Sequence, residues 1–259
     1  MAIIALLSDF GSRDWFAGEM KGAILRVAPK ATIVDITHEI EPGAIADAAF
    51  TLLSCYQTFP KGTVFCSVVD PGVGSERAAI AVKTDAHFFT GPDNGILSWV
   101  LKKEKKHAVR LIESRDFTSP STSRTFHGRD IFGPAAAHLA AGADFEKIGP
   151  LHPRIVELPW PAAIYDNERI VGSIIHIDRF GNAVTTIDSK TLSILARPPR
   201  GVLIVKSVHE LPIRDFFQQA PPGQGIAYIG STGYFEIAIN GDSAEAIFDL
   251  HVGDKIEVL

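Results

Sequence analysis

Cysteine is nearly absent from this chain of 259 residues. The two that occur, Cys55 and Cys66, are spaced too widely for a CxxC redox pair or a zinc knuckle. Cys66 lies in the apolar stretch TVFCSVV, where a cysteine usually acts as a small buried apolar residue. The sequence therefore predicts two reduced cysteines and a cytoplasmic location.

Excess positive charge and long apolar runs are also missing. The formal net charge is -5, so no basic field favours nucleic acid as a partner. No uninterrupted apolar stretch reaches the length that spans a membrane, so we expect no membrane partner. The first residues, MAIIALLSDF, lack a basic start and reach Asp9 too soon for a secretory signal. We interpret this apolar run as a strand.

Several well-known motifs can be excluded. The chain has no GxxxxGK[ST] P-loop and no GxGxxG dinucleotide motif, and its nine histidines show no HxH or HxxxH spacing. The tetrapeptide SDFG at residues 8–11 resembles the magnesium-binding segment of kinases. A kinase, however, carries its glycine-rich loop, strand lysine and catalytic loop before that segment, and only eight residues precede Asp9. We predict neither a metal nor a cofactor.

The first half of the chain alternates between strand-like and helix-like segments. AIIALL, ATIVDI, TVFCSVV, AAIAVKT and HFFT read as strands, and helices are expected at 16–28, 44–56 and 130–141. This alternation predicts an α/β domain with parallel strand pairing and helices on both faces of the sheet, which we assign to residues 1–155. The stretch from Ile148 to Pro161 holds four prolines and suits a linker.

The second half, residues 163–259, consists mainly of short strand-like runs separated by Gly, Pro and Asp. It predicts a small antiparallel β domain, either a barrel or a sandwich.

Three polar stretches of the first domain are candidates for chemistry. Asp9 follows the first strand, where a carboxylate can bond a ribose diol, or it caps a turn or helix. In SVVDPGVGSER, the turn can return Arg77 to Asp70, either as a functional pair or as an ion pair that closes the turn. His127 lies in a polar loop before a helix. It is either a surface residue or a partner of Asp70 and Arg77 in space.

The second domain also has candidate binding residues, and each of them can instead have a purely structural role in a turn. HIDRFGNAVTTI places Asp178, Phe180 and Asn182 around Gly181, which suits an ordinary turn as well as a pocket for a base. YIGSTGYFEIAIN offers Ser231 and Glu236 under the same ambiguity.

Taken together, SDFG, VVDPGVGSER, FHGRDIF, DRFGNAVT and STGYFEIAIN resemble the S-adenosyl-L-methionine (SAM) hydrolases, also called SAM hydroxide adenosyltransferases, which are relatives of the fluorinases and chlorinases. The motifs follow the family's order nearly end to end. The resemblance implies a Rossmann-like N-terminal domain, a C-terminal β-barrel domain and a homotrimer. Each active site would lie between the N-terminal domain of one subunit and the C-terminal domain of the next.

The resemblance also implies roles for individual residues. Asp70, Arg77 and His127 would activate a water molecule, and Asp9 would hold the ribose hydroxyls. The other substrate contacts would come from the second domain: Phe180 and Asn182 at the adenine, Asp178 at the methionine ammonium, Ser231 at its carboxylate, and Tyr234 and Glu236 along the adenine side. Phe216 would cover the second adenine face, with Phe217 an equal candidate.

The implied reaction is hydrolysis of SAM to adenosine and L-methionine by attack of water on ribose C5′. Fluorinases carry tyrosines in place of Asp70 and His127, and an insertion that this chain lacks. Both departures favour hydroxide over halide as the nucleophile. Two alternatives remain open: a SAM-dependent halogenase, and a module that binds SAM or adenosine with negligible turnover.

Overall fold

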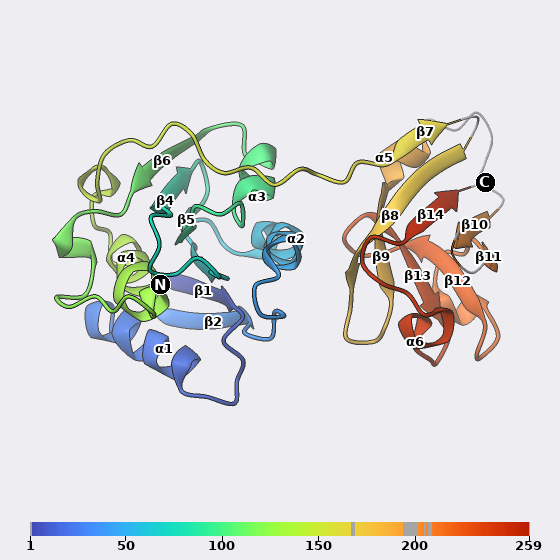
Figure 1. Ribbon diagram of the computed structural model, residues 1–259, viewed down its shortest axis with the longest axis horizontal. Helices are drawn as coiled ribbons and strands as arrows, with labels where there is room; N and C mark the ends of the chain where they lie inside the picture. The colour runs from blue at the N-terminus through green and yellow to red at the C-terminus, as the bar shows by residue number, and fades with distance from the viewer. Residues whose placement is uncertain (1, 167–168, 194–200, 205, 207–208, 259) are drawn as a thin grey trace. The chain divides into compact units, whose positions relative to one another are not determined.

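The computed structural model describes residues 2–166, 169–193, 201–204, 206 and 209–258. The chain divides into two compact units, Met1–Leu158 and Pro159–Leu259, and each has its own hydrophobic core. Figure 1 shows both units and labels most of their helices and strands.

The first unit is a six-stranded sheet between two layers of helices (Figure 1). Its strands, in the sheet order β2-β1-β3-β5-β4-β6, are β2 (Thr32–Thr37), β1 (Ile3–Ser8), β3 (Val64–Val68), β5 (Phe88–Pro92), β4 (Ala79–Thr84) and β6 (His107–Leu111). Its helices and helical turns are α1 (Phe16–Val27), α2 (Ile45–Cys55), η1 (Tyr56–Thr58), α3 (Ser98–Lys103), η2 (Arg115–Phe117), η3 (Gly128–Phe132), α4 (Gly133–Ala140) and η4 (Phe145–Lys147).

The strand β1 shows why apolar runs fill the centre of this sheet. Successive side chains of a strand point to opposite faces. Ile4 and Leu6 pack in the core cluster formed with α1 and α4, whereas Ala5 and Leu7 pack in the cluster formed with α2 and α3. Both faces are covered, so the strand is apolar at every position, as expected for a central parallel strand.

The expected parallel pairing is confirmed for most of the sheet but is wrong for β4. The pairs β1–β2, β1–β3 and β3–β5 are parallel. β4 is antiparallel to both β5 and β6. Only residues 85–87 separate β4 from β5, and such a short connection can form a hairpin but not a crossover.

The proline-rich segment predicted as a linker is bound to the first unit as far as residue 158. The Asp93 carboxylate accepts hydrogen bonds from the His152 ring at 3.0 Å and from the Val156 N–H at 2.8 Å. Further along, the Leu158 N–H donates to Ser98 Oγ at 3.1 Å, and the Trp99 indole donates to the Leu158 carbonyl at 3.1 Å. Asp93 thus has a structural role, because its carboxylate ties this segment to the first unit.

The second unit is an antiparallel, nearly closed β-barrel. Its strand order is β11-β10-β14-β8-β9-β13-β12, with β7 also paired to β8, and an isolated bridge between Ile213 and Ala227 joins the two ends. The elements are β7 (Ile164–Asp166), β8 (Arg169–Ile177), β9 (Ala183–Asp188), α5 (Ser189–Leu192), β10 (Gly201–Ile204), β11 (His209–Pro212), η5 (Phe217–Gln219), β12 (Gly225–Ile229), β13 (Tyr234–Ile239), α6 (Ala244–Phe248) and β14 (Lys255–Val258).

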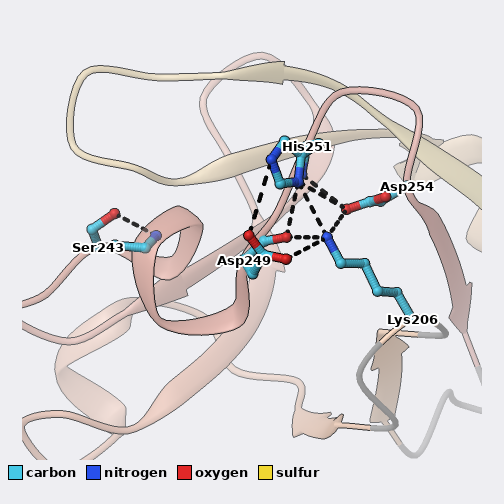
Figure 2. A network of polar contacts seen from close by, with 6 residues as sticks. Lys206, Ser243, Asp249, His251 and Asp254 are labelled. Atoms are coloured by element: carbon cyan, nitrogen blue, oxygen red, sulfur yellow. Dashed lines mark hydrogen bonds and ion pairs between the residues drawn. The ribbon is translucent and has the colours of Figure 1, made fainter.

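A charged network on the surface of the second unit fixes the turn between α6 and β14. Lys206, just after β10, donates to the Asp249 backbone carbonyl, to His251 Nδ1 at 3.1 Å and to Asp254 Oδ2 at 3.4 Å (Figure 2). Asp249 ends α6 in the left-handed conformation, with φ of 53°. None of the motif residues belongs to this network, so we interpret it as structural.

Candidate active site

Asp9 lies at the carboxyl end of β1, where the chain leaves the sheet. One of its carboxylate oxygens, Oδ2, accepts a hydrogen bond from the Gly43 N–H at 3.0 Å, in the loop between β2 and α2. The backbone of Gly11 donates to the His38 carbonyl at 2.7 Å in the same region. Asp9 therefore connects two loops at the sheet edge, rather than capping α1, whose N-cap residue is Trp15.

Asp70 and Arg77 form a tight ion pair across the turn that follows β3. Arg77 Nε donates to both carboxylate oxygens of Asp70 at 2.9 Å, and its Nη2 donates to Oδ2. The side chains are only 5% and 11% exposed for Asp70 and Arg77, respectively. The guanidinium also lies 5.1 Å from the centre of the Phe132 ring. A nearly buried, multiply bonded pair of this kind has a fixed geometry.

His127 joins this pair through Arg77. Arg77 Nη2 lies 2.6 Å from His127 Nδ1. A guanidinium can only donate, so Nδ1 must be the accepting nitrogen and the ring proton of a neutral His127 must lie on Nε2. Burial lowers the pKa of His127 and the charge of Arg77 lowers it further, although Asp70 and Asp130 act in the opposite direction. The neutral ring is thus the favoured form.

Close packing of two loops brings these residues together. Gly74, between Asp70 and Arg77, has a φ of +79°. A Cβ at this position would lie about 1 Å inside the ordinary contact distance of 3.4 Å from the Arg124 carbonyl, in the loop before His127. Gly128, directly after His127, is also tightly packed, because a Cβ there would lie 2.9 Å from the Phe10 ring. Glycine is needed at Gly74 because two backbone segments meet there, whereas the neighbour of Gly128 is a side chain.

The turn between β8 and β9 is organised by Asp178. Its Oδ1 accepts from the backbone N–H groups of Phe180 and Asn182, at 2.8 and 2.9 Å, and its Oδ2 accepts from Asn182 Nδ2 at 3.0 Å. Gly181 has a φ of +78°, and a Cβ there would overlap the Ser243 side chain. Asp178 therefore stabilises the turn. In this turn the Phe180 side chain points to the surface, and 78% of the residue is exposed.

A cavity of about 450 Å³ lies beside this turn. Its volume falls in the range of pockets that bind small molecules. Phe217, and not Phe216, belongs to its lining. Phe217 also packs edge-on against Tyr228, with ring centres 5.8 Å apart. The residues that line the cavity are Phe180, Asn182, Phe217, Ala238, Ile239, Gly241 and Asp242.

The remaining candidates of the second unit lie at or near the turn between β12 and β13. Ser231 is exposed in this turn, and the Tyr234 ring packs on Trp160 with ring centres 5.8 Å apart. Glu236 accepts from the Tyr228 hydroxyl at 2.8 Å and lies against Gly230. Burial raises the pKa of Glu236, the bond from Tyr228 lowers it, and the charge of Asp178 raises it again. Glu236 does not line the cavity and instead holds Tyr228, which supports Phe217.

The sequence did not indicate Gly74, Tyr228 or Asp130 as parts of the site. Gly74 was visible only as one glycine of a turn, and Tyr228 lies within an ordinary strand pattern. In the part of the chain that the structure describes, no group of three or more His, Cys, Asp or Glu residues could hold a metal ion. No helix among the described residues is long and apolar enough to span a membrane.

Comparisons with known proteins cover both units. The family models for the SAM hydroxide adenosyltransferase N-terminal and C-terminal domains match residues 4–149 and 172–257. A protein of Thermus thermophilus named (R)-S-adenosyl-L-methionine hydrolase is 35% identical over 267 residues, covering 100% of both chains. A fluorinase of Nocardia brasiliensis is 29% identical, covering 99% of this chain and 96% of the other. The crystal structure of an uncharacterized conserved protein from Thermotoga maritima superposes with a TM-score of 0.94 at 34% identity, covering 98% of this chain and 99% of that one.

Proposed function

This chain belongs to the SAM hydroxide adenosyltransferase family, and on that premise we propose that it is an enzyme that hydrolyses S-adenosyl-L-methionine to adenosine and L-methionine. The observation that carries the proposal is the contact of Arg77 with both Asp70 and His127. Asp70 lies 7 residues before Arg77 and His127 lies 50 residues after it, so the fold brings three distant polar side chains together.

The reaction needs an oxygen nucleophile in line with ribose C5′. One water oxygen forms a bond to C5′ while the bond from C5′ to the sulfonium sulfur breaks and its electron pair goes to sulfur. The leaving group is a neutral thioether, so no general acid and no cofactor is required. The proton that the water loses passes to Asp70 and from there to solvent.

Asp70 is the group best placed to hold this water. Nδ1 of His127 is occupied by Arg77 and cannot act as a base while that contact lasts. A carboxylate offers about four acceptor positions, and Arg77 makes three bonds to Asp70, which leaves one for water. Assistance by a general base typically contributes 10²–10⁴-fold, or about 3 to 5 kcal/mol, and positioning can contribute as much again.

We assign substrate contacts to residues near the Asp70–Arg77–His127 cluster and to residues near the cavity beside the turn between β8 and β9. In this proposal Asp9 accepts from the ribose hydroxyls, and Phe180 and Phe217 enclose the adenine while Asn182 bonds its polar edge. The charge of Asp178 attracts the methionine ammonium and Ser231 binds its carboxylate. Tyr234 and Glu236 support the adenine side, Glu236 through Tyr228. The support for the aromatic pair is that both rings line one cavity.

We further propose a homotrimer in which the N-terminal domain of one subunit and the C-terminal domain of the next complete each site, in the cytoplasm. The support is the family membership together with the division of the site residues between the two units. Mass measurement of the protein in solution, by light scattering, tests the trimer.

The experiment that tests the function is turnover of SAM in water enriched in ¹⁸O. Hydrolysis at C5′ predicts many equivalents of adenosine and methionine per protein, with one ¹⁸O atom in the 5′-hydroxyl of adenosine. The same reaction with fluoride or chloride present should give no 5′-halogenated nucleoside. Adenosine that stops at one equivalent would indicate a binding module, and a halogenated product would indicate a halogenase.

A further inference from the structure

Asp130 is a buried carboxylate that the proposed reaction does not use. It lies three residues after His127, in the π-helical turn η3, and is 3% exposed. Helical turns of this kind are rare and frequently occur at functional sites. Burying a carboxylate is costly unless it is paired and hydrogen-bonded, so its partners indicate what it stabilises.

The partners of Asp130 fix the loop that leads to His127. Asp130 Oδ2 accepts from the Ser123 N–H at 2.8 Å, and the Asp130 carbonyl accepts from the Ser119 N–H at 2.8 Å. The Asp130 N–H in turn donates to the Phe126 carbonyl at 3.2 Å. One residue therefore holds the loop 119–126 at three points.

Arg129 forms an ion pair with Asp130 and offsets its negative charge. Its Nε donates to Asp130 Oδ1 at 2.7 Å and its Nη2 to Oδ2 at 3.0 Å. Arg129 Nη1 also reaches Glu19 on α1 at 3.3 Å, and the guanidinium lies 5.0 Å from the centre of the Phe126 ring. Glu19 thus belongs to the same cluster through its bond from Arg129.

The anchored loop leads directly into His127. Asp130 holds the Ser123 N–H and the Phe126 carbonyl, which lie four residues and one residue before the imidazole. The position of the proton on an imidazole is set by the partner of each nitrogen. Arg77 occupies Nδ1 as a donor, so a neutral ring held in this place carries its proton on Nε2.

Resting on the proposed function, we propose that Asp130 is a positioning residue that fixes the loop at Ser123 and thereby holds His127 in the tautomer that accepts from Arg77. Without this anchor, the ring can rotate or move its proton to Nδ1. Arg77 then faces a donor rather than an acceptor, and its alignment of Asp70 is lost.

The test measures the tautomer and the turnover separately. Long-range ¹H–¹⁵N NMR spectra distinguish the two neutral tautomers, and the signals of His127 are assigned from their loss in His127→Gln. The wild-type protein should show the proton on Nε2. Asp130→Asn should populate the Nδ1–H form and lower kcat at least tenfold, with KM for SAM within threefold of wild type.

Glu19→Gln is the matched control, because it neutralises a carboxylate on Arg129 without touching Ser123. It should keep the wild-type tautomer and a kcat within twofold. If thermal unfolding shows that Asp130→Asn does not fold, Asp130→Glu replaces it. Its longer side chain keeps the charge beside Arg129 but moves the acceptor away from the Ser123 N–H, so the same change of tautomer is expected.

Three results would overturn the proposal: an Nδ1 proton in the wild type, an unchanged tautomer in a folded Asp130 variant, or a changed tautomer with unchanged kcat. A wild-type protein that produces no adenosine but shows the expected tautomers would refute the proposed function and leave the positioning role of Asp130 intact.

Discussion

Gly74→Ala tests whether close packing of two loops creates the catalytic geometry. Gly74 has a φ of +79°, and an added Cβ would lie about 1 Å inside ordinary contact with the Arg124 carbonyl. The left-handed backbone costs an alanine roughly 1–2 kcal/mol. The overlap adds a second effect, because the loops that carry Arg77 and His127 must separate by about the same 1 Å. A displacement of this size in a catalytic group typically lowers the rate about 10²-fold.

The chain offers a control that separates these two effects. Gly142, after α4, has a φ of +90°, but nothing lies within 4 Å of a Cβ added there. Gly142→Ala should therefore lose about 1–2 kcal/mol of unfolding free energy and keep its kcat. Gly74→Ala should lose at least as much stability and, in addition, about 10²-fold in kcat.

The assay combines urea denaturation with chromatographic measurement of adenosine formed from SAM. Denaturation gives the unfolding free energy of each variant, and turnover at saturating SAM gives kcat for the folded fraction. A folded Gly74→Ala protein with a kcat within twofold of wild type would refute the reasoning. The contact between the two loops would then have no part in placing His127 against Arg77.

Three further changes test other parts of the site. Asp70→Asn should lower kcat about 10²–10⁴-fold, with little change in the dissociation constant for SAM, because an amide oxygen can accept a hydrogen bond from water but cannot take its proton. Single-turnover rates give the first quantity and calorimetry the second. Phe217→Ala should weaken adenosine binding by about 1–3 kcal/mol in calorimetry, whereas Phe216→Ala should leave it nearly unchanged, because only Phe217 lines the cavity. The raised pKa of Glu236 means that the folded state binds its proton more tightly than the unfolded state. The unfolding free energy should therefore decrease as pH rises above about 4.5. Glu236→Gln should remove the share of this decrease that comes from Glu236. Denaturation over a pH series measures both profiles.

Each of these changes has an outcome that contradicts it. For Asp70→Asn it is a loss of SAM binding with unchanged turnover of the bound fraction. For the phenylalanines it is an equal loss at both positions or a larger loss at Phe216. For Glu236→Gln it is a stability profile that parallels the wild type at every pH.

The arrangement of elements was largely predictable from local patterns. The uninterrupted apolar residues of β1 indicated a buried strand. The spacing of Phe16, Met20, Ile24 and Val27 indicated α1, which begins at the expected residue and ends one residue earlier than expected. The reversed β4 was missed because the pattern of a strand does not depend on its direction. The short connection at residues 85–87 was the one available signal.

The candidate site divides in the same way. The turn PGVG predicted that Arg77 can reach Asp70, since both ends of a short turn must be close. The turn of Asp178 around Gly181 was equally visible. The sequence could not decide between Phe216 and Phe217. Both residues are phenylalanine, and only the direction of each side chain determines which one lines the cavity.

The amino-acid sequence by itself indicated the two domains, the strand-forming segments and the contact that the PGVG turn allows between Asp70 and Arg77. The tertiary structure alone decided that His127 meets Arg77, fifty residues earlier in the chain, and that Asp130 anchors the loop between them. The physical reason is that contacts across a turn are fixed by backbone geometry over a few residues. A contact between distant loops depends on how closely their backbones pack, and here that is decided at Gly74 and Arg124.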